Sequence, residues 1–114
     1  MMGSRISCEI PDNQKTYEIT PFVLEIRCDT MKRIITSLQK TSSDFEKSLL
    51  LRKANRIADL TKYGVRIAKN AYTGYALEII ITKLEEYQYN ISIEKYVIAK
   101  ECIERILVEK NNYF

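Results

Sequence analysis

The residues best placed to bind a ligand are five basic side chains in the middle of the chain. They are Arg52, Arg56, Lys62, Arg66 and Lys69. On a helix they lie opposite the apolar residues, and Arg52 to Lys69 would span about 25 Å. Guanidinium groups pair with phosphate through two hydrogen bonds, and a ridge of this length can follow a nucleic-acid backbone. The segment 43–77 carries seven basic and three acidic residues, a net charge of +4.

Two other interpretations of these side chains stay open. They could form the solvated face of an amphipathic helix, neutralised by an acidic stripe of Glu94, Glu101 and Glu104 near the C-terminus. Alternatively, the small residues of the same segment and the eight tyrosines could serve helix docking between proteins. The small residues are Ala54, Ala58, Gly64, Ala68, Ala71, Gly74 and Ala76.

The sequence offers no constellation for catalysis or metal binding. It has no histidine, and its three cysteines, Cys8, Cys28 and Cys102, are far apart in the chain, so a zinc site lacks its close ligand pairs. Glu85 and Glu86 are adjacent and therefore point in different directions on a helix. The three glycines are isolated and form no phosphate-binding loop. We therefore expect a non-enzyme without a cofactor, with reduced cysteines packed as small apolar side chains.

The composition is that of one globular domain over residues 1–114. Apolar residues make up 46% and charged residues 29% of the chain. No apolar run reaches the roughly 20 residues of a membrane-spanning helix, and the N-terminus has no signal-peptide core. The expected location is the cytoplasm, with no membrane contact.

Helix signals begin at Thr20-Pro21, a cap followed by a residue suited to the first turn. The spacing predicts a helix to about Lys40 whose apolar face is Val23, Ile26, Thr30, Ile34 and Leu38. Ser43, with Glu46 three residues later, predicts the start of the next helix.

From Ser43 the apolar residues keep one helical phase across Gly64 and Gly74. Those on this line are Leu50, Ala54, Ile57, Thr61, Val65, Ala68, Tyr72, Tyr75 and Ile79. This predicts one long helix over 44–87. The alternative ends a helix at Tyr63, caps it with Gly64 and restarts near Thr73.

A turn is predicted at Gln88-Tyr89-Asn90, with Ser92 capping a last helix that ends around Lys110, before a frayed tail over 111–114. This helix directs Tyr96, Ala99, Ile103, Ile106 and Leu107 inward. Residues 1–20 are predicted as an extended segment or a short β-hairpin around Pro11.

The predicted fold is therefore mainly α, a three- or four-helix bundle-like domain. The leading functional expectation is an accessory subunit that contacts DNA or RNA through the basic helix face. The alternative is a protein–protein interaction module, either a homo-oligomer or a subunit of a larger complex.

Overall fold

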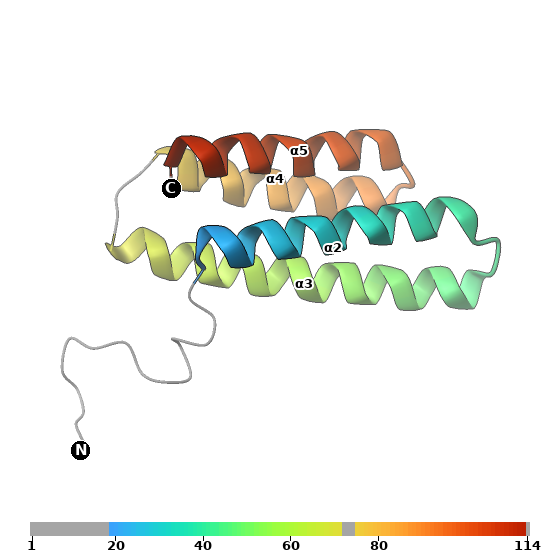
Figure 1. The fold of residues 1–114 in the computed structure, drawn as a ribbon. Coiled ribbons are helices and arrows are strands. Elements are labelled where there is room, and N and C mark those ends of the chain that lie inside the picture. The colour runs from blue at the N-terminus through green and yellow to red at the C-terminus, as the bar shows by residue number, and fades with distance from the viewer. Residues whose placement is uncertain (1–18, 72–74, 114) are drawn as a thin grey trace, which may run out of the picture.

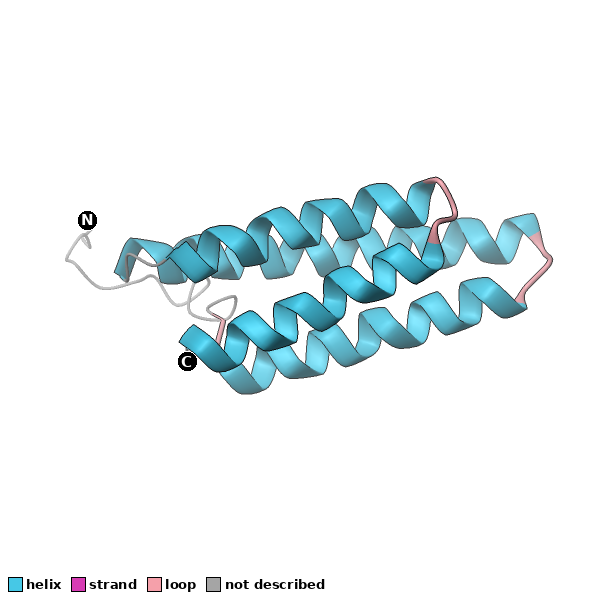
Figure 2. Cartoon of the chain, turned by 90° about the horizontal axis from the view of Figure 1, so that it is seen from above, coloured by secondary structure: helices cyan, strands magenta, loops and turns pink. Residues whose placement is uncertain are grey.

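The computed structural model describes residues 19–71 and 75–113, without the side chains of 69–71, 75, 76, 112 and 113. The described residues form four helices: α2 (Pro21–Lys40), α3 (Asp44–Ala71), α4 (Tyr75–Ser92) and α5 (Tyr96–Tyr113). They pack as a bundle in which each helix neighbours the next and α5 returns to α2 (Figure 1). The α2–α3 and α4–α5 connections lie at the same end of the bundle (Figure 2). The predicted mainly α bundle is confirmed, while the predicted N-terminal hairpin lies outside the described residues.

The first two helices begin where the capping signals predicted. The Thr20 hydroxyl accepts a hydrogen bond of 3.2 Å from the amide of Val23, and Pro21 occupies the first turn. At the start of α3 the Ser43 hydroxyl accepts a bond of 3.2 Å from the amide of Glu46. The Glu46 carboxylate does not return to Ser43 but accepts a hydrogen bond from the Thr41 hydroxyl. Both caps satisfy amides that a helix start leaves without a partner.

The middle of the chain forms two helices, so the prediction of one helix over 44–87 is wrong. The predicted alternative end at Tyr63 is also wrong, because α3 continues to Ala71 with Gly64 buried inside it. A single helix over 44–87 would be about 66 Å long, against about 30 Å for α2. Most of its apolar line would then lack a partner, whereas two helices bury that line within one bundle.

The last connection also lies later than predicted. The helix α4 continues through Gln88-Tyr89-Asn90 to Ser92, and the turn occupies Ile93–Lys95. Ser92 does not cap α5, because its hydroxyl donates a hydrogen bond of 2.6 Å to the carbonyl of Tyr89. Glu94 takes the left-handed conformation, with φ of +62°. The last helix extends beyond Lys110 to Tyr113.

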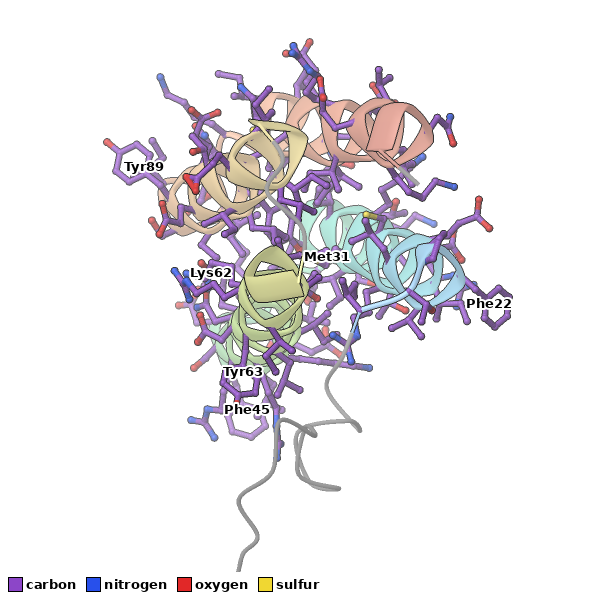
Figure 3. The ribbon with its side chains drawn as sticks, turned by 90° about the vertical axis from the view of Figure 1, so that its left-hand side faces the viewer. Phe22, Met31, Phe45, Lys62, Tyr63 and Tyr89 are labelled. Atoms are coloured by element: carbon purple, nitrogen blue, oxygen red, sulfur yellow. The ribbon has the colours of Figure 1, made fainter. Side chains whose placement is uncertain are left out.

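The core lies between all four helices, with Met31 of α2 near its centre (Figure 3). The predicted inward residues of α5 are confirmed, since Ala99, Ile103 and Ile106 are buried and Tyr96 and Leu107 pack against them. The predicted face of α2 is confirmed in part, because Ile34 and Leu38 are buried and Val23 packs against the core, but the buried stripe is rotated away from Ile26. Ile26 is 48% exposed, and the buried face consists of Leu24, Cys28, Met31, Ile34, Ile35 and Leu38. Neighbours on both sides of α2 select this broader stripe.

Candidate interaction site on the outer face of α3

Arg52 and Arg56 are the two predicted site residues that lie freely on the surface. Both are exposed on α3, and they line a shallow, widely open surface groove together with Ser48, Asn55, Asp59 and Leu60. Within the described residues neither arginine takes part in an ion pair. These two guanidinium groups are therefore available to a ligand.

Lys62 and Arg66 face α4 instead. The side chain of Lys62 is only 14% exposed, and its Nζ lies 3.5 Å from Oδ1 of Asp59. Arg66 Nη2 lies 3.9 Å from Oε2 of Glu85 on α4. Asp59 also accepts a hydrogen bond of 2.9 Å from the side-chain Nε2 of Gln88 on α4. The side chain of Lys69 lies outside the described residues. The structure thus brings Arg52 and Arg56 together and separates them from Lys62 and Arg66.

Among the described side chains, the acidic stripe near the C-terminus does not pair with Arg52, Arg56, Lys62 or Arg66. Glu101 and Glu104 lie on α5, which is diagonal to α3 in the bundle, and Glu94 lies in the turn before it (Figure 1). The carboxylates beside Lys62 and Arg66 come from α3 itself and from α4. The expectation that the C-terminal stripe neutralises the basic face is therefore wrong.

Apolar and aromatic side chains flank the two arginines. The sequence places Tyr63 on this side of the helix, whereas Phe45 and Leu49 were missed. Phe45 is 74% exposed, and Leu49 and Tyr63 are also exposed. Phe45 and Tyr63 project from the side of α3 that faces away from α4 and α5 (Figure 3). The available signal was their position, because a phenylalanine or leucine off the apolar line of a helix is not needed for its core.

We call this surface the α3 face. It consists of Phe45, Leu49, Arg52, Arg56, Asp59, Leu60 and Tyr63. Mixed apolar, aromatic and arginine side chains are typical of the centres of protein interfaces. An uninterrupted line of cations would be more typical of a surface that follows phosphates.

A second exposed surface lies on α5, on the opposite side of the bundle. We call it the α5 ridge: Val97, Glu101, Glu104 and Val108. Val97 is 67% and Val108 is 53% exposed. Within the described residues, Glu101 and Glu104 form no ion pair. The line of this ridge is apolar and acidic, and the exposed basic residues Lys100 and Arg105 flank it, whereas the α3 face is apolar and mainly basic.

The charges of the whole bundle follow the same division. The helices α2 and α3 hold eleven basic and five acidic residues, a net charge of +6. The helices α4 and α5 hold four basic and six acidic residues, a net charge of −2. The basic half attracts acidic surfaces. The acidic excess of the other half lies on α4, because α5 holds three basic and three acidic residues.

The described cysteines are placed as structural side chains. Cys28 and Cys102 are free and buried, and Cys8 lies outside the described residues. Burial raises the pKa of the Cys28 thiol to about 12. Burial, with the nearby Glu86 carboxylate, also raises the pKa of Cys102, whose thiol donates to Oε1 of Glu86 over 3.9 Å. A thiol held neutral in this way is a poor nucleophile and a poor metal ligand.

The described residues contain neither a metal-binding cluster nor a membrane-spanning helix. In the part of the chain that the structure describes, no cluster of acidic or cysteine side chains is arranged to hold a metal ion. No helix among the described residues has the length and apolar character needed to cross a membrane. Comparison with family models, with curated proteins and with solved structures finds no match to this chain. The function therefore has to be inferred from the side chains themselves.

Proposed function

We propose that this protein is a non-catalytic helical binding module that docks an acidic, partly apolar protein surface on its α3 face. The observation that supports this proposal is the side-chain content of that face. Phe45 and Leu49 expose apolar surface beside Arg52 and Arg56, two arginines without an ion-pair partner among the described residues. Buried aromatic and arginine side chains supply most of the binding energy in protein interfaces.

The distribution of the other basic residues favours a protein partner over a nucleic acid. A phosphate backbone rewards several free cations in a row, because each neutralised phosphate releases counterions. Here Lys62 is largely buried beside Asp59, so the row is interrupted after Arg56, and Arg66, which stays 54% exposed, lies 3.9 Å from Glu85. The apolar neighbours gain little from phosphates but gain from burial against a protein, at about 25 cal/mol per Å².

A second candidate function is contact with DNA or RNA through the same face. The exposure of Arg52, Lys53 and Arg56 on one side of α3 favours it. Asn55 lines the groove beside the arginines and could donate hydrogen bonds to sugar or base. In this case the protein would be an accessory subunit of a nucleoprotein assembly.

A photo-crosslinking amino acid at position 45 tests both candidates in one experiment. It replaces the exposed Phe45 in the full chain, and the matched control places it at the exposed polar residue Gln39. After irradiation in the producing cell, we expect protein adducts from position 45 and none from position 39. Adducts with nucleic acid would favour the second candidate, and equal labelling from both positions would contradict the proposed docking face.

Binding of labelled single- and double-stranded oligonucleotides provides the complementary measurement. If the α3 face docks only proteins, the fluorescence anisotropy of the oligonucleotides stays flat at low salt. Binding that falls steeply with salt and is lost in Arg52→Glu plus Arg56→Glu would support the nucleic-acid candidate instead.

A further inference from the structure

We infer that the α3 face binds the α5 ridge of a second copy of this chain, so that the copies associate head to tail. This inference rests on the proposed function and names its partner. It requires that the two surfaces match in size and charge, that both are free in one copy, and that symmetric pairing is less favourable.

The two surfaces carry the same pattern with opposite charge. On α3 the order is Leu49, Arg52, Arg56 and Leu60; on α5 it is Val97, Glu101, Glu104 and Val108. Each set has two like charges between two aliphatic residues, and each covers eleven residue steps, about 16 Å along the helix. The order of residue types, though not the spacing on α3, is the same from either end of each helix. Either relative orientation of the helices therefore sets arginines near glutamates and apolar ends near apolar ends.

Both sets of charges are available within one copy. Their four charged side chains are exposed, and none forms an ion pair with a described residue of its own chain. Of the apolar ends, Val97 is 67%, Val108 53% and Leu49 44% exposed, and Leu60 is half-buried. A second copy would cover this apolar surface and give each of these charges a partner of opposite sign. In a monomer the apolar surface stays in contact with water.

A symmetric dimer through either surface would bring like charges together. Two α3 faces related by a two-fold axis place Arg52 opposite Arg56 of the other copy. Two α5 ridges related in the same way place Glu101 opposite Glu104. Juxtaposed like charges repel each other and suppress such pairings. Pairing of α3 with α5 is the arrangement that avoids this repulsion.

The diagonal positions of α3 and α5 make the contact repeatable. Each copy presents the two surfaces on opposite sides of its bundle, so binding at one leaves the other open (Figure 3). Such a heterologous contact propagates through further copies, either into an open chain or into a closed ring.

Charge reversal separates this arrangement from all others. One variant carries Arg52→Glu with Arg56→Glu, a second carries Glu101→Arg with Glu104→Arg, and a third carries all four changes. Sedimentation equilibrium at low salt measures association of each. We expect wild-type association that weakens with salt, and at least about a tenfold loss of affinity in each of the first two variants.

Restoration is the decisive expected result. An equal mixture of the first two variants recreates the native pairing between unlike copies, and the four-change variant recreates it with reversed sign. Both should associate again. The matched control, Arg33→Glu with Lys40→Glu, changes the charge of α2 by the same amount and should associate like the wild type. Circular dichroism verifies the helix content of every variant.

The inference would be overturned by a wild type that stays monomeric, or by variants that fail to restore association when mixed. Its failure can be distinguished from failure of the proposed function. If position 45 crosslinks to a different protein and the chain does not associate with itself, the proposed docking face is supported and self-association is rejected. If position 45 gives no protein adduct at all, both the proposed function and the self-association of the chain are rejected.

Discussion

At the residue scale, Cys28 shows how burial in this core acts on an ionisable group. Its side chain is fully enclosed, and desolvation raises its pKa from 9.0 to about 12, although Lys110 and Lys32 oppose the rise. In the unfolded chain the thiol ionises near its ordinary pKa. Below about pH 9 this ionisation therefore does not change the free energy of unfolding. Between about pH 9 and 12 only the unfolded chain loses the proton, so the free energy of unfolding falls by about 1 kcal/mol per pH unit.

Urea unfolding between pH 8 and pH 11 tests this effect of Cys28. We expect the free energy of unfolding of the wild type to fall across this range. Cys28→Ala should be less stable at pH 8, because it leaves a small cavity, but its free energy should fall less steeply. Burial also raises the pKa of Tyr87. The free energy of unfolding of Tyr87→Phe should therefore also fall less steeply with pH than that of the wild type, which makes this variant a comparison for Cys28→Ala. Equal slopes for wild type and Cys28→Ala would mean that the thiol does not stay protonated in the fold.

At the element scale, the α4–α5 turn carries a residue in an unfavourable conformation. Glu94 has φ of +62°, its amide donates to the carbonyl of Ile91 (3.2 Å), and the amide of Lys95 donates to that of Asn90 (2.8 Å). This is the Schellman ending of a helix, at a position where glycine is usual. Since the left-handed conformation costs an ordinary residue roughly 1–2 kcal/mol, we expect Glu94→Gly to raise the free energy of unfolding by about 1 kcal/mol.

The same substitution at Glu104 serves as its control. Glu104 is exposed in the interior of α5, where glycine costs about 1 kcal/mol relative to good helix formers. Thermal and urea unfolding should therefore show opposite signs for the two variants. A Glu94→Gly variant that is destabilised to the same degree as Glu104→Gly would show that the turn does not have this left-handed ending in solution.

The elements that the sequence could predict are those set by local chemistry. Thr20 and Ser43 start helices because a hydroxyl three residues before a free amide is enough to satisfy it. The turn at 93–95 was missed because it contains no glycine or proline. The rotation of α2 was missed because the burial of Leu24 rather than Ile26 depends on helices far along the chain.

The site shows the same limit. Exposure of Arg52 and Arg56 follows from their phase on the helix, opposite the apolar line. The partner of Arg66 does not follow from it, because Glu85 lies nineteen residues later and reaches Arg66 only after α4 folds back onto α3. The sequence can predict which residues lie on the outer face of a helix. Tertiary packing decides which charges on that face remain without an ion-pair partner.

At the scale of the whole molecule, the separation of charge gives the bundle a direction. The α2–α3 half carries a net charge of +6 and the α4–α5 half −2, with the α3 face and the α5 ridge on opposite sides. If copies join through these two surfaces, every open assembly keeps one free α3 face at one end and one free α5 ridge at the other. The weight-average mass should then continue to rise with protein concentration until a ring closes, and should fall as salt screens the contact.

A chain-capping experiment tests this directionality. The variant Arg52→Glu plus Arg56→Glu keeps its α5 ridge, so it can bind the α3 face of a wild-type copy but offers no functional α3 face itself. About one part in ten of this variant should shorten the assemblies and lower the weight-average mass measured by light scattering. The control Arg33→Glu plus Lys40→Glu keeps both surfaces and should join without lowering the mass. If the two variants act alike, the copies are not joined head to tail through α3 and α5.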